Sequence, residues 1–208
     1  MSTNSATLVL VSPRNPEPTR TAVLAAADEL LEAGGPEAVT LRAVGAAAGV
    51  SRSAPYRHFE GKAELLEALA LRTLVDLGTA IRRAAAAATG PEEQLRLGCR
   101  GYVDYALQHP QHYLLVFGSA PLGIVDPAIE AAADEGFAAV VDLVNEAQSA
   151  ALLPRAPARE LATVLWALLH GLAQLQLTRH LHEPRTVDGD VRLDELIDVA
   201  LAAWRPIA

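Results

Sequence analysis

The chain has 208 residues, of which 51% are hydrophobic, a composition typical of a folded globular protein with one or two domains. Alanine and leucine dominate while aromatic residues make up only 4%, so the composition favours helices over strands. The net charge of −8 excludes nucleic-acid binding through the whole surface, and any contact with DNA must therefore be local.

Disulfide-stapled and membrane-spanning architectures are not expected. Cys99 is the single cysteine, so no intrachain disulfide can form, and a reduced cytoplasm is the simplest interpretation. The apolar run at 8–11 is too short for a signal peptide. No stretch approaches the roughly 20 unbroken apolar residues of a membrane helix. We therefore expect a soluble cytoplasmic protein with no membrane partner.

The first segment, residues 1–18, is expected to be a mobile arm. It mixes Ser, Thr and Asn with three prolines, which discourage regular structure. Arg14 in this arm and Arg20 just beyond it could reach a DNA minor groove. An unstructured tail is the favoured interpretation.

The next segment has the pattern of a longer helix followed by two short helices that meet at a tight turn. The longer helix is expected at 19–33, where a pair of glycines ends it. The two short helices are expected at 40–48 and 51–59, each with a polar N-cap. Gly49 between them tolerates the positive φ of a tight turn, and Gly45 is small where the helices cross. This is the geometry of a helix-turn-helix, whose second helix can enter a DNA major groove.

The distribution of charge agrees with a local DNA contact. Residues 40–62 contain four basic side chains and a single acid, whereas residues 73–208 contain ten arginines and 17 acids. A compact basic patch on an acidic body favours phosphate binding at the patch and keeps the rest of the surface off the DNA.

The helix-turn-helix also resembles a known family. The first helix, the turn and the junction Tyr-Arg-His-Phe-Glu-Gly-Lys-Ala-Glu-Leu-Leu at 56–66 are similar to the DNA-binding domain of the tetracycline-repressor (TetR) family, over about residues 19–69. The resemblance implies that residues 19–68 form a DNA-binding domain. The residues that match the family's DNA contacts are Arg52, Ser53 and Tyr56, with Thr40, Arg42, His58 and Lys62 near the phosphates.

Elementary chemistry supports these roles. Arg52 can form a bidentate contact with a guanine edge or a phosphate, and the hydroxyls of Tyr56 and Thr40 can donate to phosphate. Lys62 begins the following helix, whose N-terminus also attracts anions. Arg57 could contact DNA or be a solvated surface charge, and the two interpretations have equal weight. His58 could equally contact DNA or serve as a packing or capping residue.

One residue departs from the family pattern. Pro55 stands before Tyr56, where the family usually has a larger aliphatic residue. Proline removes a backbone donor and restrains the residue before it, so the third helix is expected to start late or to be kinked.

The rest of the chain, residues 69–208, is expected to form a larger helical domain for ligand binding and dimerisation. Glycine and proline punctuation divides it, no strand pattern appears, and the whole chain is predicted to be all-α with about nine helices. The remaining helices are expected at 61–88, 92–108, 111–117, 127–151, 156–181 and 191–203. The last two are candidates for a homodimeric four-helix bundle.

A ligand pocket is expected within this domain. Trp166, His170 and Gly171 lie in a nearly all-apolar run and resemble a Trp-His-Gly element of one group of TetR-type C-terminal domains. An apolar cavity with a few polar anchors is the usual form of a small-molecule site, although a histidine on an apolar helix is more often a core residue. The candidate ligand-binding residues are Tyr102, Tyr105, His109, Tyr113, Phe117, Trp166 and His170.

Metal, cofactor and enzyme sites are not expected. Pro110 interrupts the geometry between His109 and His112, and no HExxH, nucleophile elbow, phosphate loop or dinucleotide fingerprint is present. The sequence therefore predicts a ligand-responsive regulator, a dimeric repressor on palindromic operator DNA that a small molecule releases. An activator remains open. The alternative is a helical small-molecule-binding or enzymatic protein with an incidental basic N-terminus.

Overall fold

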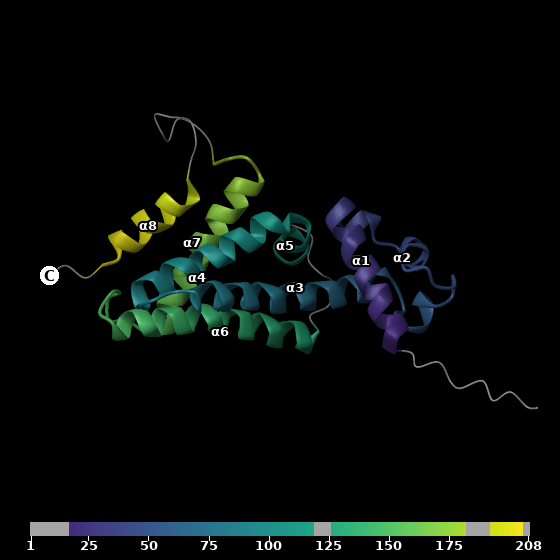
Figure 1. Ribbon diagram of the computed structural model, residues 1–208, viewed down its shortest axis with the longest axis horizontal. Helices are drawn as coiled ribbons and strands as arrows, with labels where there is room; N and C mark the ends of the chain where they lie inside the picture. Colours follow the sequence, from purple (N-terminus) through teal and green to yellow (C-terminus); the bar gives the residue numbers. More distant parts are fainter. Residues whose placement is uncertain (1–16, 119–125, 182–191, 206–208) are drawn as a thin grey trace, which may run out of the picture.

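The fold is all-α, as the sequence predicts. The computed structural model describes residues 17–118, 126–181 and 192–205. Within these ranges the chain forms eight α-helices, one short 3₁₀ helix and no β-strand (Figure 1). None of the helices in these ranges is long and apolar enough to cross a membrane.

The N-terminal part consists of α1 (Glu17–Ala38), α2 (Leu41–Ala47) and the 3₁₀ helix η1 (Pro55–Arg57). Helix α1 begins two residues before the expected start, and the rest of the predicted arm lies outside the described residues. The helix breaks at the glycine pair where an end was predicted, and Gly35 adopts a φ of 67°.

The predicted third helix at 51–59 is wrong in its form, because the structure contains only the short η1 within that segment. Pro55 has no N–H to donate to the Ser51 carbonyl, so an α-helical ladder cannot start there. Instead the Ala54 N–H donates to the Ser51 oxygen at 2.9 Å, which closes a tighter turn, and the Phe59 N–H donates to the Pro55 oxygen at 3.0 Å. The segment keeps its place after α2 but is an irregular series of turns.

The long helix α3 (Lys62–Ala85) runs through both hydrophobic cores of the molecule. Its first half contributes Leu65 and Leu69 to a smaller core shared with α1 and α2. Its second half contributes Leu77 and Ile81 to a larger core. Because one continuous helix belongs to both cores, a change in its tilt in one core would also move its residues in the other core.

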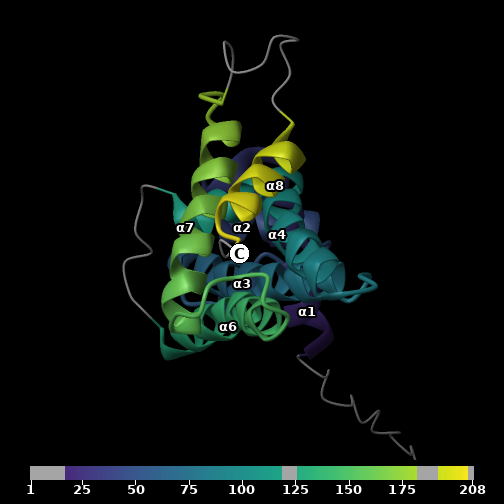
Figure 2. The same cartoon turned by 90° about the vertical axis from the view of Figure 1, so that its left-hand side faces the viewer.

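The remaining helices build the larger core around α3 (Figure 2). They are α4 (Pro91–Gln108), α5 (Pro110–Phe117), α6 (Pro127–Ser149), α7 (Ala158–Leu177) and α8 (Leu193–Ala203). Their ends lie within a few residues of the predicted ones, and three of them begin with proline, which is favoured in the first turn because its missing N–H would be unpaired there. Ion pairs Arg100–Asp194 and Arg205–Glu92 connect the last helical segment to α4.

Helix α5 is a second element that belongs to both cores. Tyr113 is fully buried in the larger core, and Leu115 is buried in the smaller one. His112 faces α1, where its ring nitrogens lie 2.9 Å from Glu32 Oε2 and 3.1 Å from Asp28 Oδ1. Helices α3 and α5 together therefore connect the two cores.

Candidate nucleic-acid interface and ligand cavity

The turn after α2 has the backbone that a helix-turn-helix needs. Thr40 is the N-cap of α2, and its Oγ1 accepts from the Ala43 N–H at 3.2 Å. Gly49 has a φ of 64°, a conformation that side chains disfavour, so the predicted positive φ is confirmed. A Cβ at Gly45 would lie 3.1 Å from Pro55 Cγ, so the expected close approach is also confirmed.

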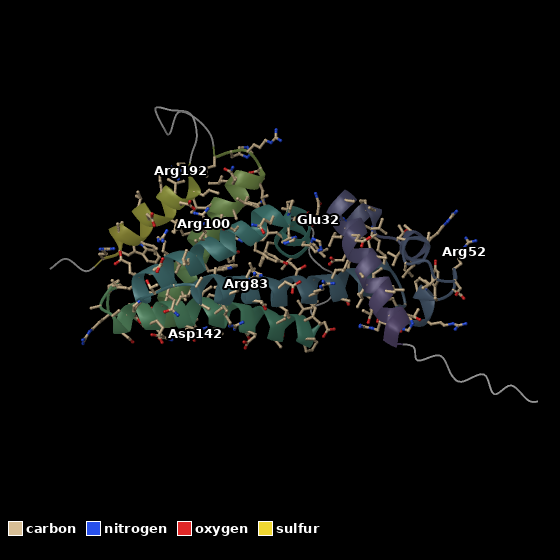
Figure 3. The ribbon with its side chains drawn as sticks, in the orientation of Figure 1. Glu32, Arg52, Arg83, Arg100, Asp142 and Arg192 are labelled. Carbon is tan, nitrogen blue, oxygen red and sulfur yellow. The ribbon has the colours of Figure 1, made fainter. Side chains whose placement is uncertain are left out.

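The segment after this turn points its polar side chains outward. Ala54, Pro55 and Phe59 are buried and fix the backbone against α1 and α2. Arg52 lies at the outer end of the molecule and points away from the helical body (Figure 3). Tyr56 is 58% exposed, although tyrosine usually packs its ring, which leaves its hydroxyl available to a partner.

Five of the seven predicted DNA-contact residues are exposed at this end: Thr40, Arg42, Arg52, Ser53 and Tyr56. His58 is half-buried. Lys62 is also half-buried, and its Nζ lies 3.2 Å from Glu37 Oε2. A surface ion pair of this kind contributes at most about 1 kcal/mol, so Lys62 can exchange Glu37 for a phosphate.

Arg20 is the one N-terminal arginine within the described residues. It belongs to α1, and its guanidinium carbon lies 5.4 Å from the centre of the Phe59 ring. This cation–π contact attaches α1 to the segment that carries Arg52 and Tyr56. Arg14, the other arginine considered for the minor groove, lies outside the described residues.

A cavity of about 330 Å³ lies in the larger core, a volume suited to a small organic molecule. Its walls come from α3, α4, α5, α6 and α7 and are mostly apolar or aromatic. The lining residues are Leu74, Leu77, Ile81, Tyr102, Phe117, Ala133, Asp134, Gly136, Phe137, Val140, Arg159, Thr163 and Trp166.

The seven predicted ligand residues divide into three groups. Tyr102, Phe117 and Trp166 line the cavity. Tyr113 and His170 are not among its lining residues but stand behind it, since the His170 ring lies 5.3 Å from the Phe117 ring and 5.4 Å from the Trp166 ring between centres.

The other two, Tyr105 and His109, do not line this cavity either. Their rings lie 4.9 Å apart between centres at the end of α4, near α1. They lie at the junction of the two cores, where the end of α4 approaches α1 and His109 Nδ1 lies 3.8 Å from Glu32 Oε2.

The candidate ligand-binding residues did not include the wall from α6 and the start of α7. Phe137 and Arg159 form it, with the Arg159 guanidinium carbon 5.1 Å from the centre of the Phe137 ring. Arg159 also lies 3.5 Å from Asp134 Oδ1. The apolar spacing of α6 could have indicated which residues face inward, but not that they face a cavity.

A buried hydrogen-bond cluster supports the cavity wall. Tyr113 Oη lies 2.8 Å from His170 Nδ1 and 3.0 Å from Tyr102 Oη. Burial raises the pKa of Tyr113 to about 12 and also raises the pKa of Tyr102, while burial lowers the pKa of His170. Both phenols therefore keep their protons. A neutral His170 can accept a hydrogen bond at Nδ1 from one of the two hydroxyls.

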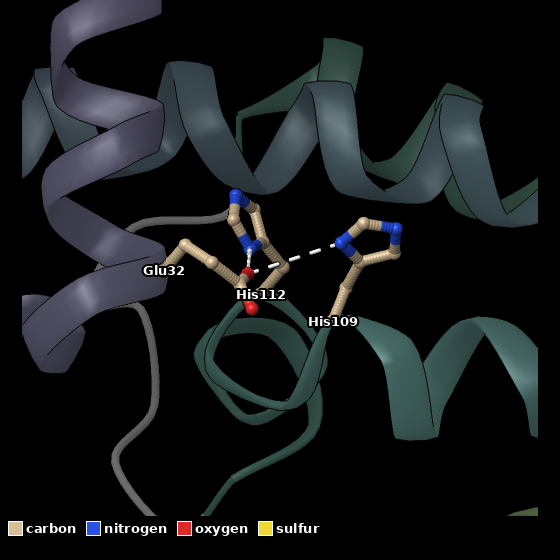
Figure 4. Close-up of side chains that lie close together, drawn as sticks. All are labelled: Glu32, His109 and His112. Atoms are coloured by element: carbon tan, nitrogen blue, oxygen red, sulfur yellow. Dashed lines mark hydrogen bonds and ion pairs between the residues drawn. The ribbon is translucent and has the colours of Figure 1, made fainter.

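Pro110 interrupts the helix between His109 and His112, as expected, but it does not keep their side chains apart. Pro110 is the first residue of α5 and His109 precedes it as the cap, so the chain turns between the two histidines. Both rings approach Glu32 of α1 (Figure 4), with His112 Nδ1 2.9 Å and His109 Nδ1 3.8 Å from Glu32 Oε2. The sequence could not indicate this cluster because its third member comes from a distant helix.

Comparison with known proteins supports the same interpretation. Residues 23–69 match the model for bacterial regulatory proteins of the tetR family, and residues 95–200 match the model for the tetracyclin repressor-like C-terminal domain. The HTH-type transcriptional repressor LfrR of Mycolicibacterium smegmatis is 35% identical over 153 residues, which cover 74% of this chain and 76% of that protein. An uncharacterised HTH-type regulator of Mycobacterium tuberculosis is 27% identical over 76% of this chain and 70% of its own length.

A solved structure of a protein of unknown function from Rhodococcus sp. RHA1 has the same fold. It superposes with a TM-score of 0.76 at 28% identity and covers 95% of this chain and 97% of that chain. The matched models span both the helix-turn-helix and the larger helical core, and the resemblance inferred from residues 19–69 is confirmed. The chain belongs to the TetR family of bacterial transcriptional regulators.

Proposed function

We propose that the protein is a dimeric repressor that binds palindromic operator DNA and leaves it when a small molecule occupies the cavity. The observation that carries this proposal is the exposed group of Arg52, Ser53 and Tyr56 on the turn after α2. Helices α2 and α8 lie at opposite ends of the molecule (Figure 1). Residues 19–68 are proposed as the DNA-binding unit and residues 69–208 as the sensing and dimerising unit. The operator would place the protein in the cytoplasm.

The irregular backbone around Pro55 affects how this unit reads DNA. A regular recognition helix presents successive turns to the major groove, whereas here η1 is only three residues long. Base contacts are therefore proposed for Arg52 and Ser53, which precede Pro55. Phosphate contacts are proposed for Thr40, Arg42, Tyr56, His58 and Lys62.

The effector is proposed to be a small, largely apolar aromatic compound. Phe117, Phe137 and Trp166 offer ring faces, and Tyr102 offers one buried hydroxyl. Arg159 and Asp134 add opposite charges at an exposed edge of the cavity, where they can bind a polar substituent.

Helices α3 and α5 are proposed to carry the signal. Leu74, Leu77 and Ile81 of α3 and Phe117 of α5 line the cavity, while other residues of both helices pack in the smaller core. A ligand that separates the cavity walls would tilt these helices and change the spacing of the two turns in the dimer. Successive major-groove faces lie about 34–36 Å apart, so a change in spacing weakens binding.

The coupling can be tested by titration. A panel of apolar aromatic compounds would first be ranked by the rise in melting temperature that each causes. The best compound should weaken binding to the operator in fluorescence anisotropy, and the operator should weaken binding of the compound by the same factor. A compound that binds with equal affinity in the presence and absence of operator would contradict the mechanism. Trp166→Ala should lower affinity for the compound and leave operator binding intact.

The dimer is proposed to form through α7 and α8. Val164, Ala167, Gly171 and Leu175 share one face of α7 outside the protein's own core, and Val164 and Leu175 are 54% and 43% exposed. On α8, Val199 is 66% exposed. An apolar stripe on α7 and an exposed valine on α8 fit a four-helix bundle with a second copy. The small residues Ala162 and Ala173 of α7 do not belong to this face, because both are buried within the chain's own core.

A charge-insertion variant tests this surface. Val164→Glu combined with Leu175→Glu should yield a monomer by sedimentation velocity, because four carboxylates would be buried in the bundle without partners. The variant should also lose operator affinity, since one protomer contacts one half-site. Val75→Glu on α3 is the matched control, because Val75 is 52% exposed and lies off this surface. A double variant that remains dimeric would exclude this interface.

The family comparisons do not favour the alternative of an enzyme or simple binding protein with an incidental basic N-terminus. We propose that the protein has no enzymatic activity and that the ligand acts only by changing its affinity for operator DNA.

A further inference from the structure

We propose that Glu32, His109 and His112 form a binding site for a divalent transition-metal ion of the zinc type, which joins α1 to the α4–α5 corner. The three side chains come from α1 and from the α4–α5 corner and converge on one point between them (Figure 4). This site is separate from the cavity, and the proposal does not depend on the DNA-binding function.

The distances between the potential ligand atoms suit a metal ion. One atom from each of the three residues lies within 4.8 Å of the others, and Glu32 Oε2 lies 2.9 Å from His112 Nδ1 and 3.8 Å from His109 Nδ1. Zinc bonds of about 2.0–2.2 Å place neighbouring ligand atoms of a tetrahedral site about 3.3–3.6 Å apart. The Glu32 and His109 side chains are 43% and 46% exposed, so small rotations can bring their atoms to these separations.

His112 is already oriented as a metal ligand. It is 7% exposed, and its second nitrogen, Nε2, lies 3.1 Å from Asp28 Oδ1. When Nδ1 binds a metal, the other ring N–H usually donates to a carboxylate, which fixes the tautomer and strengthens the ligand. Asp28 occupies that position. Its Oδ1 also lies 3.7 Å from Arg72 Nη1, which helps to balance its charge.

A metal ion would also bridge His112 and Glu32. Both ring nitrogens of His112 face carboxylate oxygens, Nδ1 toward Glu32 and Nε2 toward Asp28. A metal ion at Nδ1 takes the place of one hydrogen and binds Glu32 at the same time. Two imidazoles and one carboxylate are a donor set that zinc and its neighbours accept, with the fourth position open to water.

Metal titration of the full-length, untagged protein tests the site. After treatment with a chelator and its removal, Zn²⁺ should bind by calorimetry with one ion per chain. Co²⁺ should give the intense visible absorption of a four-coordinate centre. Zn²⁺ should also raise the melting temperature, because it binds the folded arrangement. These measurements use no DNA, so their result is independent of the regulator proposal.

Four variants separate a metal site from a plain ion-pair cluster. Asp28→Asn should weaken Zn²⁺ binding about 10–100-fold, as expected for a residue that positions a ligand. His109→Ala and Glu32→Gln should each weaken it more and remove the four-coordinate Co²⁺ spectrum. His180→Ala is the matched control, since His180 is exposed just beyond the C-terminal end of α7 and its replacement should leave binding unchanged.

The His109 and Glu32 variants should fold, because both side chains are partly exposed. Circular dichroism without metal checks each variant. The proposal is overturned if the wild-type protein shows no saturable binding of either ion. It is also overturned if His109→Ala and Glu32→Gln bind both ions as the wild type does, because the three side chains would then form an ion-pair cluster only.

Discussion

The double variant Arg52→Ala Tyr56→Ala is expected to lose specific operator binding while it keeps its fold and its dimeric state. Arg52 is exposed at the tip of the molecule and offers a planar bidentate donor, and Tyr56 is 58% exposed beside the buried Pro55. A bidentate base contact contributes about 1–3 kcal/mol, so removal of Arg52 alone should weaken binding about 5- to 150-fold. Loss of the Tyr56 phosphate contact adds to this.

Fluorescence anisotropy with a labelled operator measures the loss of affinity. The dependence of affinity on salt concentration then shows whether Arg52 contacts a base or a phosphate. If Arg52 contacts a base, Arg52→Ala should relax specificity at one operator position and leave the slope of log affinity against log salt concentration unchanged. If it binds a phosphate, the slope should fall by about one unit. Arg155→Ala removes an exposed arginine between α6 and α7 and should leave operator affinity unchanged. Equal affinity of the double variant and the wild type would exclude this surface.

Replacement of Tyr113 by alanine is expected to destabilise the protein more than any other change considered. Tyr113 is fully buried, packs edge-on against Tyr102 with ring centres 6.1 Å apart, and bonds His170 Nδ1 at 2.8 Å. Truncation of a buried aromatic ring to alanine costs about 3–5 kcal/mol, since contacts are lost and a cavity remains. Tyr113→Phe removes only the hydroxyl and should cost about 1 kcal/mol, because Tyr102 can still bond His170.

Urea unfolding followed by circular dichroism at one fixed protein concentration gives these free energies, since the stability of a dimer depends on concentration. Tyr113→Phe serves as the control that separates ring packing from hydrogen bonding. If both variants lose the same small free energy, the ring does not stabilise the cavity wall as the burial indicates.

The helix boundaries were largely predictable because glycine and proline act locally. The pair Gly34–Gly35 breaks α1, and prolines 91, 110 and 127 each begin a helix near the predicted position. The turn at Gly49 was predictable for the same reason, since its positive φ is a property of one residue. At 51–59 the N-cap and turn pattern predicted a helix that Pro55 would delay or kink, but the missing N–H of Pro55 left only a 3₁₀ turn.

The sites were less predictable because they depend on which helix faces meet. Tyr102, Phe117 and Trp166 were found from their chemistry, but the cavity wall from α6 depends on how that helix packs against α3. Tyr105 and His109 share the aromatic character of the cavity residues but face α1 instead. The convergence of His109, His112 and Glu32 joins segments far apart in the chain, which no local pattern encodes.

The most direct test is competition binding of the purified full-length protein to an inverted repeat from DNA next to its gene, with a scrambled duplex as competitor, monitored together with the mass of the complex. We expect two protomers on each repeat and a preference over the scrambled duplex of at least about 10³-fold. A single protomer on either duplex, with equal affinity for both at low salt, would contradict the role assigned to the exposed turn after α2.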